Sequence, residues 1–230
     1  ITEKLDIIQK PQFKTILDIG SRSPILTQYL QQRYDAKITQ TDLSAKILEN
    51  STADIKFQCD EEALPFKNEK FDLIISLLNL HNINDLESVL KNIHNLLSDK
   101  GIFIASYFGG ATLTELRKSI LLADAQLDGA SPRISPFIDV KTAASLLSHT
   151  GFAMPVTNSD KLRIEYQDPN ILYRDIKNIG ESNILLNSSK YLLSRRRLAK
   201  ISEIYQNKFS NNTNEIIATF EIINLTAFKK

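Results

Sequence analysis

The amino-acid sequence predicts an α/β protein with a Rossmann-like, doubly wound, seven-stranded sheet and a helical cap. First, short apolar segments alternate with helical segments from Thr15 to about Tyr107, which is typical of a parallel sheet whose strands are joined by helices. Second, residues 71–77 are almost all apolar, as expected of a strand buried on both faces. Third, an isolated strand pattern at 215–228 ends the chain. We therefore predict the strand order 3-2-1-4-5-7-6, with strand 7 antiparallel.

The first half of the chain supplies five strands. They are expected at residues 15–19, 37–41, 54–58, 71–77 and 102–107, and a turn at 99–101 precedes the last of them. Three helices are expected at 24–34, 45–50 and 85–97. Ser23 is a good N-cap for the first helix, Pro24 suits its first position, and Ser44 is expected to cap the second. The third helix has apolar residues at 86, 89, 90, 93, 96 and 97, which form one helical face.

The second half of the chain is richer in helical patterns. Helices are expected at 112–127, 139–150, 170–179 and 188–208, and strands at 153–156, 162–166 and 215–228. We treat residues 1–230 as one domain, within which the helical segments 112–150 and 170–208 form the substrate side. Residues 170–208 are expected to cap the carboxyl ends of the strands, because such insertions commonly shape the substrate site.

Composition argues against several kinds of partner. The 28 basic and 27 acidic residues give a net charge of +1, so nothing indicates nucleic acid or an anionic membrane. No apolar run is long enough for a membrane span. The histidines and the single cysteine have no zinc-ligand spacing, so no metal is predicted. Cys59 has no partner for an internal disulfide, which favours a reducing compartment.

The turn between the first strand and the first helix is the first candidate ligand site, because ligands of open parallel sheets bind at the carboxyl ends of the strands. Gly20 permits close approach of the backbone to a ligand. The helix that begins at Pro24 favours a negative group at its N-terminus, and Asp18 can hold an ammonium group. The alternative is a sharp strand-to-helix turn that simply needs one glycine.

Two more acidic residues end the second and third strands. Asp42 lies 22 residues after Gly20, and a carboxylate there can accept hydrogen bonds from both ribose hydroxyls of a nucleoside. Asp60 can accept a hydrogen bond from an adenine amino group. Taken singly, each could be a solvated acid or a helix cap. Together with Asp18, they place three acids on successive strand ends, which indicates a nucleoside-binding ancestry.

These segments resemble the successive motifs of S-adenosylmethionine (SAM)-dependent class I methyltransferases. The resemblance rests on residues 16–20, 41–44, 63–66, 71–76 and 97–101. Within that superfamily, the chain resembles the malonyl-carrier-protein O-methyltransferases of biotin synthesis. It resembles still more closely the mitochondrial complex I assembly factor with a methyltransferase fold, a branch linked to arginine hydroxylation of a complex I subunit. This closer resemblance rests on residues 80–85, 108–117, 131–137 and 179–183.

The resemblance implies SAM as the cofactor. It places ten residues around it: Asp18, Gly20, Ser21, Arg22, Asp42, Leu43, Asp60, Glu61, Ser76 and Leu77. The family pattern is Asp-x-Gly-x-Gly-x-Gly, and here Arg22 and Pro24 replace its last two glycines. Arg22 is expected to fill ligand space or to strain the backbone by about 1–3 kcal/mol, unless it turns outward or pairs with the ligand carboxylate. We therefore expect SAM binding to be weak or lost.

Five polar residues are candidates for catalysis or substrate binding: His81, Arg117, Arg133, Glu181 and Asn183. His81 follows the fourth strand and is either a base or a packed residue. The two arginines could bind a carboxylate or an acidic peptide, although Arg117 could also be a plain exposed helix residue. The segment with Glu181 and Asn183 could simply be a turn after Gly180. Arginines 195–197 are expected on a solvated helix face, with docking of a partner as the alternative.

Three functions stay open. The first is a SAM-binding enzyme of the assembly-factor branch that modifies or chaperones a protein partner, by resemblance a complex I subunit. The second is carboxyl O-methylation of a malonyl-carrier protein, and the third is a non-catalytic assembly protein with a degenerate SAM pocket. The printed chain begins at Ile1 and not at methionine, which leaves open what precedes it. The expected location is the cytoplasm of a bacterium, or the mitochondrial matrix in a eukaryote.

Overall fold

The computed structural model describes residues 2–8, 12–67, 69–127, 138–181 and 194–230. The chain divides into two compact units, each of which is described by itself. The sheet unit comprises residues 1–108, 138–160 and 222–230, and the helical unit comprises residues 109–137 and 161–221.

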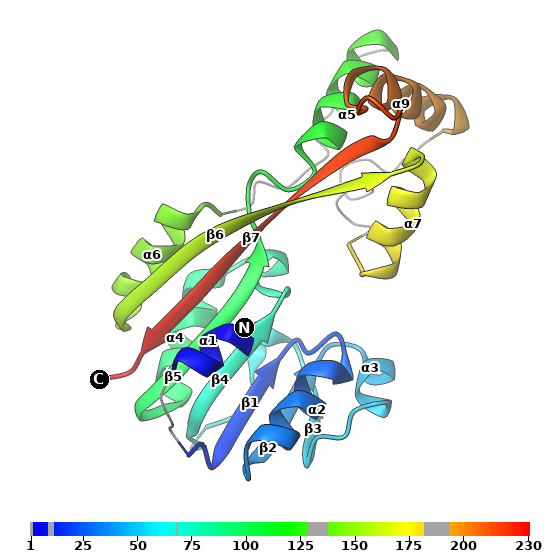
Figure 1. The fold of residues 1–230 in the computed structure, drawn as a ribbon. Coiled ribbons are helices and arrows are strands. Elements are labelled where there is room, and N and C mark those ends of the chain that lie inside the picture. Colours follow the sequence, from blue (N-terminus) through cyan, green and yellow to red (C-terminus); the bar gives the residue numbers. More distant parts are fainter. Residues whose placement is uncertain (1, 9–11, 68, 128–137, 182–193) are drawn as a thin grey trace. The chain divides into compact units, whose positions relative to one another are not determined.

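One seven-stranded sheet runs in the order β3-β2-β1-β4-β5-β7-β6, as predicted (Figure 1). The pairs β3–β2, β2–β1, β1–β4 and β4–β5 are parallel, and β7 is antiparallel to β5, with Ile102 opposite Phe228. The strands are β1 (Thr15–Ile19), β2 (Lys37–Asp42), β3 (Ile55–Gln58), β4 (Phe71–Leu77), β5 (Leu97–Phe108), β6 (Ala153–Tyr166) and β7 (Ile216–Phe228).

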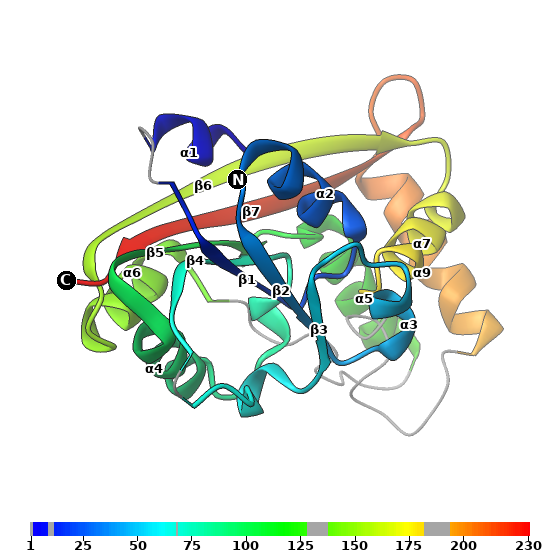
Figure 2. The ribbon, with the colours of Figure 1, turned by 90° about the horizontal axis from the view of Figure 1, so that it is seen from below.

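Helices pack on both faces of the sheet unit because successive side chains of each strand point to opposite faces. Leu17 and Ile19 of β1 belong to the core beneath α4 (Leu86–Leu96) and α6 (Val140–His149). Ile16, between them, belongs to the core beneath α1 (Thr2–Ile7) and α2 (Pro24–Arg33). Figure 2 shows these two helical layers on either side of the sheet.

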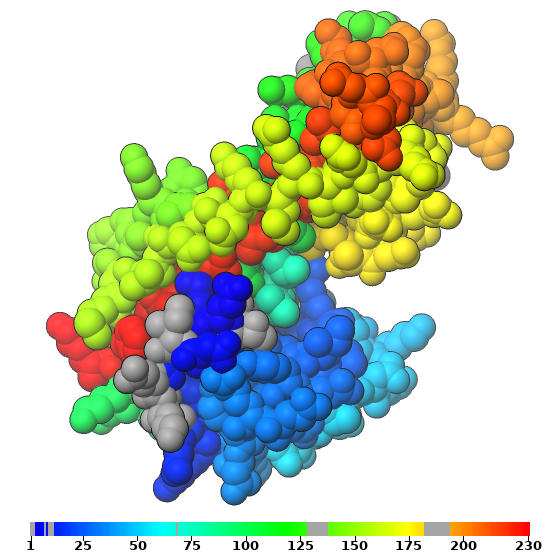
Figure 3. Space-filling model, viewed as in Figure 1, coloured from blue at the N-terminus to red at the C-terminus, as the bar shows by residue number. Residues whose placement is uncertain are grey.

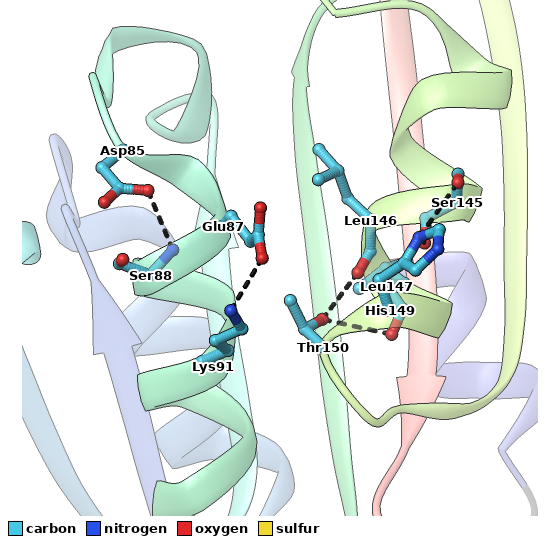
Figure 4. Close-up of polar contacts among 9 residues, drawn as sticks. All are labelled: Asp85, Glu87, Ser88, Lys91, Ser145, Leu146, Leu147, His149 and Thr150. Carbon is cyan, nitrogen blue, oxygen red and sulfur yellow. Dashed lines mark hydrogen bonds and ion pairs between the residues drawn. The ribbon is translucent and has the colours of Figure 1, made fainter.

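Local side-chain contacts stabilise α4 and the end of α6 (Figure 4). Asp85 Oδ1 accepts a hydrogen bond from the Ser88 N–H at 3.0 Å and so caps α4. Lys91 pairs with Glu87 one turn earlier, at 2.7 Å. At the end of α6, the N–H and the hydroxyl of Thr150 both donate to the Leu146 carbonyl, at 2.9 and 2.8 Å, and so close the last turn of the helix.

One local prediction is wrong, and two are confirmed only in part. The strands expected at 153–156 and 162–166 are one strand, β6, because edge pairing with β7 tolerates the polar, exposed side chains between them, which lie on the surface in Figure 3. Ser44 occupies the N-cap position of α3 (Ala45–Glu49), as predicted, but its side chain makes no capping hydrogen bond; its N–H donates to Asp42 Oδ1 at 2.7 Å. The turn predicted at 99–101 is present, but it lies inside β5: the strand begins at Leu97 and not at Ile102, its pairing with β4 is irregular between these two residues, and Lys100 adopts a φ of 62°.

The helical unit is built from α5 (Thr114–Leu127), α7 (Pro169–Asn178) and α9 (Arg195–Lys208). Helix α9 contacts both others, and Tyr205 on it donates a hydrogen bond to the Ile217 carbonyl at 2.9 Å. Residues 188–193, where this helix was predicted to start, lie outside the described part of the chain. The placement of residues 170–208 over the carboxyl ends of the strands stays a prediction.

The arginine run at the start of α9 is not wholly solvated, contrary to the prediction. Arg197 Nε lies 3.1 Å from Asp124 Oδ1, and the Asp124 side chain on α5 is 0% exposed. Arg195 and Arg196 are exposed. The run therefore includes one structural ion pair, because a buried carboxylate needs a cationic or hydrogen-bonding partner.

Candidate ligand site at the carboxyl ends of strands β1 and β2

The turn after β1 requires glycine at position 20. Gly20 has a φ of +63°, in the left-handed region that favours glycine, and its N–H donates to the Thr41 carbonyl at 2.9 Å. A Cβ at this position would overlap the side chain of Asn79, which follows β4. Backbone geometry and the packing of Asn79 therefore both exclude a larger residue, and the turn stays close to the strand ends.

Asp18 is a buried carboxylate with only one oxygen satisfied. Its Oδ2 accepts hydrogen bonds from Thr27 Oγ1 and Gln40 Nε2, both at 3.4 Å. Its Oδ1 is equally buried and accepts no hydrogen bond from the described residues. Burial raises the pKa of Asp18 to about 6, although nearby hydrogen-bonding side chains of Ser21, Gln40 and Thr27 oppose the shift. An unpaired buried acceptor needs an explanation, and a cationic ligand group supplies one.

Asp42 joins the two turns at the ends of β1 and β2. Its Oδ2 accepts the Arg22 N–H at 3.2 Å, and its Oδ1 accepts the Ser44 N–H at 2.7 Å. An ionised carboxylate has about four acceptor positions, so two remain for hydroxyl groups of a ligand. Asp42 is thus both a brace for the loop and a candidate ligand contact.

Asp60 lies differently from Asp42. It is exposed, and its Oδ1 accepts the Glu62 N–H at 2.9 Å, which caps the 3₁₀ helix Glu61–Ala63. This is the cap that the sequence left open as its alternative role. Burial raises the pKa of the neighbouring Glu61 carboxyl, while the nearby Asn79 amide opposes that shift. Leu43, next to Asp42, is an exposed apolar residue.

In the turn after β1, arginine and proline occupy positions 22 and 24, where the family pattern has glycine. Arg22 has a φ of 41°, an unfavourable backbone state that costs about 1–3 kcal/mol. Its N–H bond to Asp42 helps to hold this state. Pro24 opens α2, and the Ser23 side chain accepts the Ile25 N–H, as predicted. Proline in place of glycine at position 24 is therefore compatible with the start of α2, and the backbone strain is concentrated at Arg22.

The structure brings some of the predicted cofactor residues into one hydrogen-bonded group. Asp18, Ser21, Arg22 and Asp42 are connected through Gln40 and backbone groups around Gly20. Ser76 is fully buried in β4, its hydroxyl makes no hydrogen bond to a described residue, and Leu77 is partly buried. Gln40 and Asn79 were missed by sequence reasoning. Their only signal is a polar residue within, or directly after, an otherwise buried strand.

The described catalytic candidates are divided between the two units, and their common role stays a prediction. His81 lies in the sheet unit, edge-on to Phe108 with ring centroids 5.1 Å apart. Arg117 lies in the helical unit, where burial lowers the pKa of its guanidinium. Arg133 and Asn183 lie outside the described residues.

Glu181 lies just after the end of helix α7. Gly180 has a φ of 81°, and the N–H groups of Gly180 and Glu181 donate to the carbonyls of Lys177 and Ile176, at 3.1 and 2.9 Å. This pair of bonds is a Schellman motif, which satisfies the last carbonyls of α7. The described part of the 179–183 segment is therefore a helix end, and a role of the buried Glu181 side chain in substrate binding stays a prediction.

Among the residues that the structure describes, no three histidine, cysteine or acidic side chains gather as metal ligands would. No helix in the described ranges combines the length and the apolar character needed to traverse a bilayer.

Comparison with known proteins identifies the kind of domain. Residues 17–105 match the family model described as a methyltransferase domain. The arginine-hydroxylase NDUFAF5 of Danio rerio mitochondria is 36% identical over 94% of this chain and 69% of its own length. The Rickettsia prowazekii protein RP459, provisionally named a methyltransferase, is 37% identical over 86% of this chain and 88% of its own. The malonyl-[acyl-carrier protein] O-methyltransferase 1 of Coxiella burnetii is 30% identical over 99% of this chain and 78% of its own length. The chain spans 64% of the length of the mouse NDUFAF5 relative.

Solved structures share the fold at low sequence identity. The YcgJ protein of Bacillus subtilis matches with a TM-score of 0.67 at 15% identity, over 100% of this chain and 97% of its own. A Haemonchus contortus phosphoethanolamine N-methyltransferase 2, solved in complex with SAM, matches with a TM-score of 0.57 at 16% identity. The match covers 99% of this chain and 52% of that chain.

Proposed function

Because the chain belongs to the class I SAM-dependent methyltransferase family, we propose that it binds SAM at the carboxyl ends of β1 and β2 and acts on a protein side chain. The branch that it resembles is that of the NDUFAF5 proteins. The observation that carries the proposal is the buried Asp18 carboxylate, whose Oδ1 has no hydrogen bond within the described residues. SAM has an ammonium group of the sort that this oxygen needs.

The residues around Asp18 fit the other parts of SAM. Gly20 holds the turn close to the strand ends, and the N-terminus of α2 favours the methionine carboxylate. Asp42 has acceptor positions left for the ribose hydroxyls. Leu43 offers an exposed apolar surface beside Asp42 for the adenine ring, and Asp60 and Glu61 are the acceptors proposed for its amino group. When bound, SAM supplies an electrophilic methyl group; these side chains bind and orient it.

The names of the relatives guide the choice of substrate. The NDUFAF5 relatives are named arginine-hydroxylases of mitochondria, which supports a protein arginine as the target and a mitochondrial location in a eukaryote. By resemblance, the partner is a complex I subunit. The second candidate, methylation of a malonyl-carrier protein, is supported by the 30% identity of the Coxiella enzyme over 99% of the chain. Methyl transfer to a purified malonyl-carrier protein distinguishes the two.

Replacing Asp42 by Ala is expected to weaken SAM binding about 5- to 150-fold, because two ligand hydroxyls would lose a charged acceptor, at about 1–3 kcal/mol. Glu49→Ala, at the exposed end of α3, is the matched control and should leave the dissociation constant unchanged. Titration calorimetry measures both. Since Asp42 also braces the loop, circular dichroism must show a native fold. An unchanged affinity in folded Asp42→Ala protein would remove Asp42 from the site.

A further inference from the structure

The helical unit has a shallow groove between α5 and the end of α9. The groove has a volume of about 530 Å³ and is lined by Lys118, Leu121, Leu122, Lys208 and Phe209. Figures 1 and 2 both show α5 and α9 side by side, and the two helices contact each other. Leu121 is 53% exposed and Leu122 is 36% exposed. The two adjacent leucines give this concave surface an apolar strip against which a partner's apolar side chain can be buried.

The groove residues of α5 lie on a different face of the helix from its buried residues. The inner face of α5 buries Leu116, Ile120 and Ala123. Lys118, Leu121 and Leu122 are spaced three and four residues apart and form a second stripe on the helix. The two leucines therefore do not serve the core of this unit.

The charge of the groove is basic because the acidic residues of α5 are engaged elsewhere. Glu115 accepts hydrogen bonds from the Thr219 N–H and hydroxyl, at 3.1 and 2.6 Å. Asp124 is fully buried and pairs with Arg197. The charged side chains that line the groove are two lysines, Lys118 and Lys208. An occupant with apolar residues in the centre and carboxylates at its margins complements this surface.

We propose that the groove binds an acidic amphipathic helix of a protein partner. Two apolar side chains of that helix fit between Leu121, Leu122 and Phe209, and its carboxylates pair with Lys118 and Lys208. This is helix-in-groove recognition, in which an apolar stripe gives affinity and flanking charges give orientation. A hollow with one cation from each helix suits a helical ridge better than a flat anionic membrane surface. The groove is independent of the SAM site, so either proposal can fail without the other.

The test uses the full chain and a fluorescent, helix-forming peptide of about 18 residues with leucines at i, i+3 and i+4 and glutamates beside them. Fluorescence anisotropy should show saturable binding that salt weakens. Leu121→Gln should weaken it about tenfold or more. Leu162→Gln is the matched control, since Leu162 lies in the same unit and is also 53% exposed, and it should change nothing.

Charge reversal tests whether the two lysines of the groove attract the acidic side chains of the peptide. The double variant Lys118→Glu, Lys208→Glu should lose the acidic peptide and gain a peptide in which lysines replace the glutamates. Lys161→Glu, at an exposed position of the same unit, is the control for net charge. Equal losses in the groove and control variants would overturn the proposal. Absence of peptide binding would also overturn it, as would Leu121-dependent binding only to vesicles of phosphatidylcholine and phosphatidylserine.

Discussion

Replacing Asp18 by Asn is expected to stabilise the protein and to weaken its binding of SAM. Burial raises the pKa of Asp18 from 3.8 to about 6, so the ionised carboxylate destabilises the folded state at neutral pH. Linkage converts this shift into about 3 kcal/mol of unfolding free energy. The amide keeps the shape and removes the charge. The same change removes the anion that holds the ligand ammonium, which should weaken SAM binding about 10- to 150-fold.

The gain in stability depends on pH. Since the folded pKa of Asp18 lies above its ordinary value, the unaltered protein loses stability as the pH rises from about 4 through about 6, and the Asn variant does not. Urea unfolding across this range should show the two proteins diverging and then staying apart at neutral pH. Glu49→Gln serves as an exposed carboxylate control. A difference that is the same at every pH would contradict a role for the buried charge.

Replacing Arg197 by Ala is expected to cost about 2–4 kcal/mol of unfolding free energy. The change removes the Arg197 guanidinium from the fully buried Asp124 carboxylate. Breaking a buried pair typically costs about 3–5 kcal/mol, and we lower this figure because the Arg197 side chain is 23% exposed.

Arg196→Ala is the control for Arg197→Ala, because the two residues are neighbours and Arg196 is exposed. It should change stability by less than about 0.5 kcal/mol. Urea unfolding measures both variants, and adding Asp124→Asn to Arg197→Ala should recover part of the loss. Equal effects of the two arginine variants would show that the Arg197–Asp124 ion pair makes no particular contribution to the unfolding free energy.

The fold was predictable because its signals are local. Continuous apolar runs mark the strands, as at 71–77, and polar residues such as Ser23 and Asp85 mark where helices begin. Strand β6 was split in error because its middle is polar and its pairing with β7 comes from residues far along the chain. The Arg197–Asp124 pair joins helices that are also far apart in sequence, and residue pattern does not reveal such pairs.

The site was predictable only in outline. Asp42 and Asp60 both follow strands, yet Asp42 braces two turns while Asp60 caps a short helix. The difference depends on which backbone N–H groups lie near each carboxylate, and that is a property of the folded loop. Likewise, the sequence shows that Arg22 replaces glycine. Only the structure shows that its backbone adopts a φ of 41° and donates to Asp42.

The central claim is that the ionised Asp18 carboxylate holds the ammonium group of SAM. Calorimetric titration of the unaltered chain with SAM, at about pH 7.5 and about pH 5, tests it most directly. We expect binding at the higher pH. At the lower pH, about one unit below the pKa of about 6, the affinity should fall about tenfold, and binding should release protons. Absence of binding at pH 7.5 by a chain with a native circular dichroism spectrum, or an affinity that is equal at both pH values, would contradict the claim.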